Sequence, residues 1–314
     1  MNLPYLSVIV PLFNEEESVP LLYRAIVDAL EGADRSFQII FVDDGSSDAT
    51  YSVALELAKK DQRLGLIKFR KNFGQTPAMA AGIDHASGEV LVTMDGDLQN
   101  DPRDIDQLVR EIEAGYDIAV GWRFERKDRL VSRKIPSRIA NWLIGKVTGV
   151  PIKDNGCSLK AYRASVIKEV PLYSEMHRFI PAMASITGAR VVEKKVRHHA
   201  RQFGESKYGL ARIYKVLFDL LAIRTITAFA ARPTIWFGLL ATPFLAGGLA
   251  LLAAAAWVAI VSPGSSIVVY SGLAFLAVAT ASFLGICGVL GELVFRTGNS
   301  RPVDFARLTL SYDA

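Results

Sequence analysis

The chain has 314 residues, 51% of them hydrophobic, and a formal net charge of +4. This length allows one large domain with an appendage, or two modest domains. The hydrophobic fraction is high for a soluble protein and is unevenly spread, because residues 233–291 contain no Asp, Glu, Lys or Arg. Lys and Arg are concentrated in two stretches, residues 123–138 and 190–232. These basic stretches do not interleave with aromatic residues, which argues against a nucleic-acid-binding protein. They fit an anionic membrane surface or a phosphate substrate better.

Two cysteines, Cys157 and Cys287, lie on opposite sides of the composition change. Neither has metal-ligand spacing and a disulfide between them is not expected, so their use suits a reducing compartment. The N-terminus has no basic region before its short apolar stretch, and we therefore predict no signal peptide. The bulk of the chain is expected to stay in the compartment where it is synthesised.

Strand-like and helix-like segments alternate through the first 120 residues. This order indicates βαβ units and a mostly parallel sheet, in which ligands bind beyond the carboxyl ends of the strands. The expected strands are Ser7–Pro11, Phe37–Asp43, Leu64–Phe69, Val90–Met94 and Asp117–Gly121, and the expected helices are Ser18–Glu31, Ala49–Lys60, Thr76–Ser87 and 102–114. Polar clusters follow three of these strands, at Asn14–Glu15, Asp43–Asp44 and Asp95–Asp97.

The uncharged stretch predicts a membrane hairpin. A bilayer span needs about 20 apolar residues, so the stretch holds two spans, Ile235–Val261 and Ile267–Leu290, joined by Ser262–Ser266. Arginines flank both ends of the hairpin and the loop has no charge, which places both termini in the cytoplasm by the positive-inside rule. The preceding residues 210–232 are amphipathic and predict helices on the membrane interface, although an ordinary packed surface helix remains an alternative.

Asp95-Gly96-Asp97 directly follows a predicted strand. Two carboxylates two residues apart at a strand end can share one divalent cation, and hard oxygen ligands suit Mg²⁺ or Mn²⁺ completed by diphosphate oxygens. Gln99 offers a further oxygen. Taken alone, such a triplet is most often a turn or a solvated surface, so its position at the strand end is what favours a metal site.

Asp43 and Asp44 end another buried strand, where an acidic side chain can hydrogen-bond a nucleobase or ribose. Ser47 or Asp48 could simply cap the next helix, which would leave this acidic pair unexplained. The chain contains neither the dinucleotide-binding glycine fingerprint nor a P-loop. Paired aspartates without these phosphate cradles indicate a nucleotide-sugar as the ligand.

Several motifs together resemble family 2 glycosyltransferases of GT-A fold, and more narrowly the polyprenyl-phosphate glycosyltransferases, which include dolichol-phosphate mannose synthase and bacterial undecaprenyl-phosphate sugar transferases. The resemblance covers nearly the whole chain, and its motifs are specific in combination rather than singly. They are Val8–Glu16, Val42–Asp48, Asp95–Gln99, Ser137–Asn141, Asp154–Arg163 and Phe203–Tyr208.

This resemblance implies a GT-A catalytic domain at residues 1–209, interface helices at 210–232, two transmembrane helices within 233–295 and a cytoplasmic tail at 296–314. It also implies a role for individual residues. The metal would be held by Asp95, Asp97 and Gln99. The nucleotide-sugar would contact Pro11, Asn14, Glu15, Asp43, Asp44, Asn72, Gly74, Asp95 and Gly96. The acceptor phosphate would be bound by Arg123, Arg133, Ser137, Arg201 and Lys207, and catalysis would rest on Asp97, Arg123, Arg133 and Ser137.

One departure from the family pattern and two alternative interpretations accompany these roles. The family triplet is Asp-Ala-Asp, and Gly96 in place of Ala is expected to loosen the loop without removing the site. The alternative for residues 126–138 is that they only face anionic lipid. His198 and His199 follow the strand-like Val191–Val196, and we interpret them as loop residues rather than as metal ligands or a base.

The implied reaction is inverting transfer of a sugar to a polyprenyl phosphate at the cytoplasmic face of a bacterial inner or plasma membrane. A phosphate monoester has a second pKa of about 6, so the nucleophile needs no general base. UDP-glucose is the expected donor, with GDP-mannose or an aminosugar nucleotide as alternatives. The resemblance also implies a homo-oligomer, with a tetramer as the candidate state, and glycines along the hairpin would permit close helix packing.

Three rival functions remain. A processive polysaccharide synthase would need a Gln-x-x-Arg-Trp motif and a larger membrane pore, and the sequence contains neither. A channel or transporter is disfavoured because the hairpin carries no internal charge. A non-catalytic, membrane-tethered nucleotide-sugar-binding protein is disfavoured by the intact aspartate pair and the basic residues.

Overall fold

The computed structural model describes residues 3–33, 35–124, 145, 152–170, 172, 176–186, 188–200, 202–203, 232–262, 266–297 and 309–313. Four predicted phosphate-binding residues, Arg133, Ser137, Arg201 and Lys207, lie outside these ranges, as do nearly all of the expected interface helices at 210–232. The chain forms two compact units, residues 1–219 with 301–314 and residues 220–300.

The first unit contains an eight-stranded mixed sheet with the order β7-β5-β6-β4-β1-β2-β3-β8. The strands β1 to β4 are mutually parallel, so their carboxyl ends meet at one edge, the site edge. β6 runs antiparallel between β4 and β5, and β7 is parallel to β5, so β5 and β7 also end at the site edge. The strands are Leu6–Leu12 (β1), Phe37–Asp43 (β2), Leu64–Phe69 (β3), Val90–Thr93 (β4), Ile118–Arg123 (β5), Lys160–Arg163 (β6), Val191–Val196 (β7) and Thr309–Asp313 (β8).

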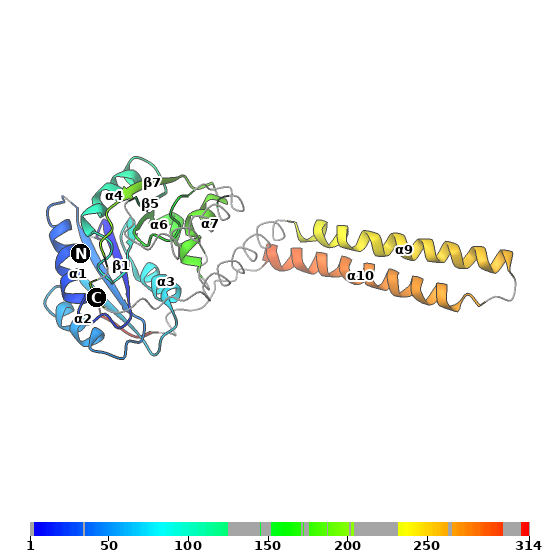
Figure 1. The fold of residues 1–314 in the computed structure, drawn as a ribbon, viewed down its shortest axis with the longest axis horizontal. Coiled ribbons are helices and arrows are strands. Elements are labelled where there is room, and N and C mark those ends of the chain that lie inside the picture. The colour runs from blue at the N-terminus through cyan, green and yellow to red at the C-terminus, as the bar shows by residue number, and fades with distance from the viewer. Residues whose placement is uncertain are drawn as a thin grey trace. The chain divides into compact units, whose positions relative to one another are not determined.

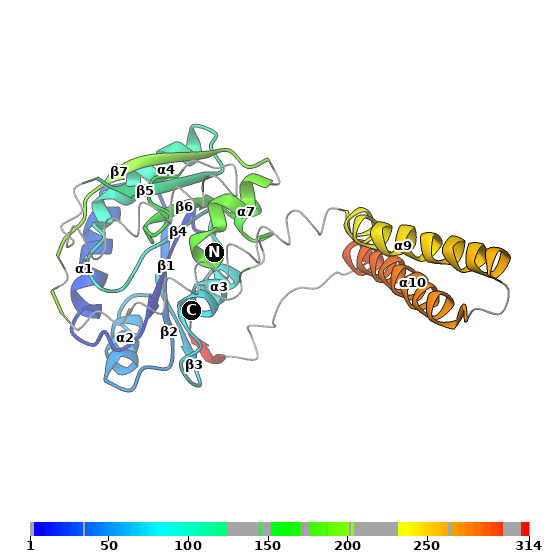
Figure 2. The ribbon, with the colours of Figure 1, turned by 45° about the vertical axis from the view of Figure 1, so that its right-hand side comes forward.

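Helices cover both faces of this sheet (Figures 1 and 2). α1, α2 and α4 pack on one face, and α3, α6 and α7 on the other. The helices are Val19–Leu30 (α1), Thr50–Ala58 (α2), Gln75–His85 (α3), Ile105–Glu113 (α4), Ala164–Ile167 (α6) and Ile180–Ile186 (α7), with 3₁₀ turns at Pro102–Asp104 (η1) and Met176–Arg178 (η3).

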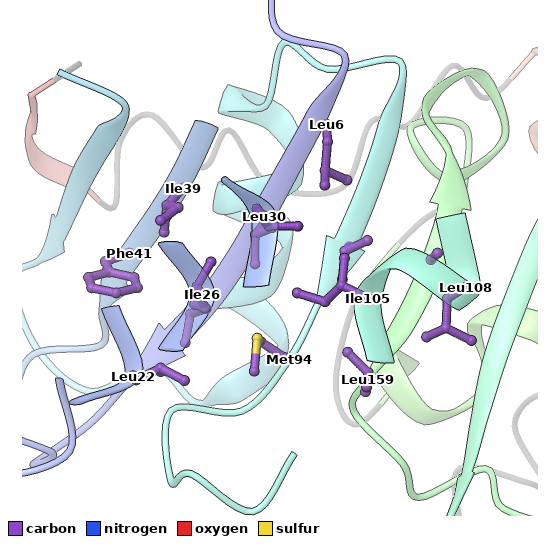
Figure 3. Close-up of a cluster of buried hydrophobic side chains, with 14 of the residues drawn as sticks. Leu6, Leu22, Ile26, Leu30, Ile39, Phe41, Met94, Ile105, Leu108 and Leu159 are labelled. Atoms are coloured by element: carbon purple, nitrogen blue, oxygen red, sulfur yellow. The ribbon is translucent and has the colours of Figure 1, made fainter. Parts of the chain in front are cut away.

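The core follows from the alternation of side chains along the strands. Figure 3 shows the layer in which Leu22 and Ile26 of α1 lie beside Phe41 of β2 and near Met94 after β4. The intervening strand residues, such as Ile9, face the opposite layer. A strand buried on both faces must be apolar nearly throughout, and each fully buried Leu or Ile side chain contributes roughly 1.5–3 kcal/mol.

Helix α3 lies very close to β1. A Cβ atom on Gly82 would be 2.3 Å from Cγ2 of Ile9 and 3.2 Å from Cγ2 of Val42. Only a residue without a side chain allows this approach. The contact matters for the site, because the first turn of α3 begins at the site edge.

The C-terminal residues add an edge strand that the sequence did not indicate. β8 pairs antiparallel with β3, with Leu66 opposite Asp313 and Lys68 opposite Ser311. Part of the predicted tail at 296–314 therefore belongs to the sheet of the first unit. Pairing with β8 covers an otherwise open sheet edge.

The second unit is a pair of long helices, α9 (Pro233–Val261) and α10 (Val268–Thr297), which pack side by side (Figure 1). Both are long and apolar enough to cross a membrane, and only 11% and 17% of their most apolar windows are buried. A core helix of a soluble protein would be mostly buried. Glycine permits the packing at Gly248, where a Cβ would lie 2.8 Å from Cγ2 of Val278, and at Gly288, where it would lie 3.0 Å from Cβ of Phe237.

Replacing Gly82 by Val should destabilise the first unit by about 2–3 kcal/mol, because the added side chain overlaps the β-branched Ile9 in a buried strand. Thermal unfolding followed by circular dichroism in detergent measures the loss. The matched control is Gly32→Val, since a Cβ on Gly32 meets no atom within 4 Å. Equal melting temperatures for the two variants would contradict the packing of α3 on β1.

Candidate active site at the carboxyl edge of the sheet

The turns after β1 and β2 are joined by hydrogen bonds. The backbone N–H of Asp44 donates to the carbonyl of Leu12 at 2.8 Å. Asn14 has φ 53°, a left-handed conformation that asparagine tolerates. Its N–H donates to Oγ of Ser46 at 3.0 Å, and its Oδ1 accepts from the N–H of Ser47 at 2.9 Å. Asn14 therefore shapes the wall of the site by fixing the neighbouring turn.

Glu15 is used in the same region to begin α1. Its backbone N–H donates to Oγ1 of Thr50 at 2.7 Å, and its carboxylate accepts from the hydroxyl of Ser18 at 2.7 Å. This geometry gives Glu15 a bracing role at the turn. Its predicted contact with a nucleotide stays a prediction.

Asp44 is buried and holds the loop after β3. Its carboxylate accepts hydrogen bonds from Nδ2 of Asn72 at 3.0 Å and from the backbone N–H groups of Phe73 and Gly74 at 2.8 Å each. Burial raises the pKa of Asp44 to about 6, although the two backbone donors act in the opposite direction. Asp44, Asn72 and Gly74, three predicted pocket residues, thus form one hydrogen-bonded group.

Asp43 is fully buried beside this group. Its Oδ1 accepts from the N–H of Ser46 at 3.2 Å, whereas its Oδ2 has no hydrogen-bond partner among the described residues. Burial raises the pKa of this carboxyl group as well. A buried acceptor without a partner is costly, and a donor from a bound ligand would remove that cost.

Two glycines allow the loops after β2 and β3 to meet. Gly45 has φ 68°, and a Cβ there would lie 2.3 Å from the backbone carbonyl carbon of Lys71. Gly74 has φ 102° and precedes the first residue of α3. The sequence motif contains Gly45, but its spacing did not reveal this close approach.

The loop after β4 carries the two aspartates predicted to hold a metal. Oδ1 of Asp95 accepts a hydrogen bond from Nε2 of Gln75 at 2.6 Å, which links β4 to the first turn of α3. Asp97 is 8% exposed, and its Oδ1 accepts from the N–H of Gln99 at 3.2 Å. Leu98, which follows the two aspartates, has φ 59°. The chain therefore turns sharply directly after Asp97.

Gly96 fits closely under β1. A Cβ at this position would lie 2.7 Å from Cδ2 of Leu12 and 3.3 Å from the carbonyl oxygen of Pro11. The first contact is with the end of a flexible side chain, so the Ala that is usual in the family needs only a small shift of Leu12. The contact also places the predicted residue Pro11 next to the loop after β4.

The chemistry of this donor set fits Mg²⁺ or Mn²⁺. Asp95 and Asp97 supply carboxylate oxygens from one tight loop, and the described residues contain no group of three or more His, Cys, Asp or Glu side chains that could enclose a metal ion. Mg²⁺ is commonly held by one or two carboxylates, with water and substrate phosphates as its other ligands. An open pair of acids is therefore the expected protein contribution.

Arg123, predicted to bind the acceptor phosphate, lies at the end of β5 and is already paired. Its Nε and Nη2 donate to the two carboxylate oxygens of Asp154 at 2.7 and 2.9 Å. Burial opposes the guanidinium charge, but Asp154 and, more weakly, Asp95 raise its pKa. The sequence motif at 154–163 contains Asp154, but residue chemistry alone did not identify it as the partner of Arg123.

A buried polar group lies on the α3 face. Nζ of Lys160 donates to the carbonyls of Asn155 and His177 at 3.3 Å each, and burial lowers the pKa of this lysine to about 8. Nδ1 of His177 is 2.7 Å from Oγ1 of Thr76. These contacts fasten η3 to α3 and to the turn after Asp154, and no sequence signal singled out this role.

The pKa of Asp44 has a consequence for stability. An Asp in an unfolded chain has a pKa of about 3.9, below the value of about 6 in the folded protein. Between these values the folded state binds more protons, so the contribution of Asp44 to stability falls as pH rises from about 4 to about 6. The melting temperature of the wild type relative to Asp44→Asn should decline over this window, and parallel curves would contradict the shift.

Comparison with known proteins identifies the family. Residues 7–171 match the model of glycosyl transferase family 2. The chain is 49% identical over 251 residues to dodecaprenyl-phosphate galacturonate synthase of Rhizobium johnstonii, covering 79% of this chain and 74% of that protein. It is 36% identical over 231 residues to undecaprenyl-phosphate 4-deoxy-4-formamido-L-arabinose transferase of Edwardsiella ictaluri, covering 73% and 71%.

Solved structures share the fold. Glucosyl-3-phosphoglycerate synthase from Mycobacterium tuberculosis, in complex with Mn²⁺, UDP and phosphoglyceric acid, aligns with a TM-score of 0.55 at 14% identity, covering 71% of this chain and 78% of that chain. Mannosyl-3-phosphoglycerate synthase from Rubrobacter xylanophilus aligns with a TM-score of 0.55 at 14% identity, covering 72% and 75%. The family model and the two relatives show that the chain belongs to glycosyltransferase family 2, within the polyprenyl-phosphate glycosyltransferases.

Proposed function

We propose that this enzyme transfers a sugar from a nucleotide-sugar to a polyprenyl phosphate at the cytoplasmic membrane face. The observation that carries the proposal is the meeting of Asp43, Asp95 and Asp97 at one sheet edge, in a chain that also has two membrane-length helices. The family membership supports this reaction, because both curated relatives are named for transfer to a polyprenyl phosphate.

The donor sugar is proposed to be a uronic acid, carried on UDP. UDP-glucose, the donor expected from the sequence, gains no support from the relatives, whose names specify galacturonate and a formamido-arabinose. The galacturonate relative has the higher identity of the two, which favours a uronic acid. The aminoarabinose class is the second choice.

In the proposed complex, Asp95 and Asp97 would hold the divalent cation, with Gln99 as a further oxygen donor. Bound there, Mg²⁺ or Mn²⁺ would neutralise the negative charge that grows on the leaving diphosphate. Asp43 would accept a hydrogen bond from the base or ribose, and the lack of a partner for its Oδ2 among the described residues supports this role. Asp44 would keep the loop at Asn72–Gly74 in the shape that encloses the nucleotide.

The acceptor phosphate would be held by arginines. The guanidinium group has five N–H donors, and Asp154 takes those of Nε and one of Nη2 in Arg123. The remaining donors, held rigid by this ion pair, would bind the phosphate. Arg133, Ser137, Arg201 and Lys207 are proposed to complete its binding site.

A phosphate monoester is mostly dianionic near neutral pH, because its second pKa is about 6. The nucleophile is therefore already charged, and the reaction needs no general base. The difficulty is to bring two anionic groups together, which explains the combination of a cation held by acids and a set of arginines.

The membrane arrangement is also a proposal. The hairpin α9–α10 would anchor the enzyme in a bacterial inner membrane with the catalytic domain and both termini in the cytoplasm. Gly248 and Gly288 bring the two helices together within one chain. Gly247 and Gly272, where a Cβ would meet no atom within 4 Å, leave smooth surfaces for packing between copies in a homo-oligomer.

A transfer assay tests the function and the metal site together. Purified enzyme is incubated with polyprenyl phosphate, Mn²⁺ and radiolabelled UDP-uronic acid, UDP-glucose, GDP-mannose or a UDP-aminosugar, and label in the lipid fraction is counted. Wild type should label the lipid most rapidly from UDP-uronic acid. Asp97→Ala should lower the rate by at least about 100-fold, because it removes stabilisation of the leaving group.

Asp28→Ala is the matched control, since Asp28 is an exposed acid on α1 that faces solvent. Its rate should equal that of the wild type. Absence of lipid-linked product with every donor would refute the proposed function. A near-normal rate for Asp97→Ala would refute only the metal assignment.

A further inference from the structure

The segment that follows β7 runs along the loop that follows β4. Asn100 and His198 form an isolated antiparallel bridge. The N–H of His199 donates to the carbonyl of Gln99 at 2.9 Å, and Nε2 of Gln99 donates to the carbonyl of His199 at 3.4 Å. These contacts join parts of the chain about a hundred residues apart, immediately beyond Asp97.

Two buried acids strengthen this contact. Asp101 is 4% exposed at its side chain, and its Oδ2 lies 3.1 Å from Nε2 of His199. A carboxylate can only accept, so Nε2 is the donor. Asp104 accepts the backbone N–H of Arg197 at 2.6 Å and its guanidinium at 2.7 and 3.0 Å. We call this set of contacts the clasp: Gln99, Asn100, Asp101 and Asp104 on one side, and Arg197, His198 and His199 on the other.

The position of the clasp in the chain suggests what it does. On one side it begins two residues after Asp97, the proposed metal ligand. On the other it ends just before Ala200 and Arg201, where the basic segment proposed to meet the phosphates begins. The loop that carries Asp97 is therefore held, directly after this aspartate, by the chain that follows β7.

We propose that His199 is a positioning residue, whose bond to Asp101 closes the clasp and holds the metal-binding loop that carries Asp97 in the shape that binds a diphosphate. This inference rests on the proposed function. It assigns Gln99 a second role, since the amide of Gln99 holds the opposing chain through its Nε2. Asp101 and Asp104 are the residues at the starts of η1 and α4. In this proposal they also hold the segment that follows β7.

The test compares three variants of the full-length enzyme in detergent. His199→Ala removes the bond to Asp101 from a side chain that is 47% exposed, so the fold should persist. His199→Gln keeps a nitrogen donor near the position of Nε2. Arg103→Ala is the matched control, because Arg103 is 65% exposed and binds the same Asp101, but it makes no described contact with the segment after β7.

The first measurement is independent of activity and of nucleotide. Amide hydrogen exchange in residues 197–200 should be faster in His199→Ala than in wild type, and close to wild type in His199→Gln and Arg103→Ala. Unchanged exchange in His199→Ala would refute the closing role of His199.

The second measurement is the affinity for UDP in the presence of Mn²⁺ by calorimetry, together with KM for the nucleotide-sugar. His199→Ala should lower the UDP affinity and raise KM, each by about tenfold, which is the effect of one hydrogen bond to a charged group. His199→Gln should restore both values to within about twofold of wild type. Faster exchange with unchanged UDP affinity and KM would show that the clasp is only structural, and would overturn the proposal.

These two measurements separate the proposal from the proposed function. If wild type neither binds UDP with Mn²⁺ nor transfers sugar, the proposed function fails whatever the exchange data show. If wild type does both and His199→Ala behaves as wild type does, the positioning role fails and the proposed function stands.

Discussion

The constraint on which the site depends is the gathering of negative charge at one edge of the sheet. Parallel pairing of β1 to β4 brings their carboxyl ends together. Asp43 ends β2, and Asp44, Asp95 and Asp97 lie in the turns that follow β2 and β4. Burying such groups without partners is unfavourable. The protein supplies partners for some of these groups. Three donors bind the carboxylate of Asp44, and the side-chain amide of Gln75 binds that of Asp95. Arg123, at the end of β5, is paired with Asp154.

This partial compensation connects the fold to the chemistry. Asp43 retains an oxygen without a partner in the described part of the chain. Among the same described residues, no further acid, histidine or cysteine joins Asp95 and Asp97 in a metal-binding group. A cation bound with phosphate oxygens and a nucleoside would satisfy both. The same features would look like defects in a protein that bound nothing there.

Much of the fold could be predicted from local sequence because its strands are apolar and end abruptly. β2, β3 and β7 have the predicted limits. β2 and β3 are mostly apolar runs bounded by polar turns, and β7 begins and ends with β-branched valines. β6 and β8 were not predicted, because each is short and owes its existence to pairing with a distant strand. Long-range pairing leaves little trace in local composition.

The candidate site was predictable to the extent that residue chemistry marks it. Acids at strand ends stand out in the sequence, and the structure brings Asp44, Asn72, Gly74, Asp95 and Gly96 together around Pro11 and Asn14. Supporting residues such as Gln75, Asp154 and His199 did not stand out, because each acts on another side chain far away in sequence. Gly45 is a similar case, since its value lies in an approach to Lys71 that only the fold reveals.

The central claim, that the acids at the site edge bind a nucleoside diphosphate through a divalent cation, is tested most directly by calorimetric titration of UDP into the wild-type protein with Mn²⁺ and again with EDTA. The account predicts binding with Mn²⁺ that is at least about tenfold tighter than without it, since the metal offsets the charge of both partners. Equal affinity under the two conditions would contradict it.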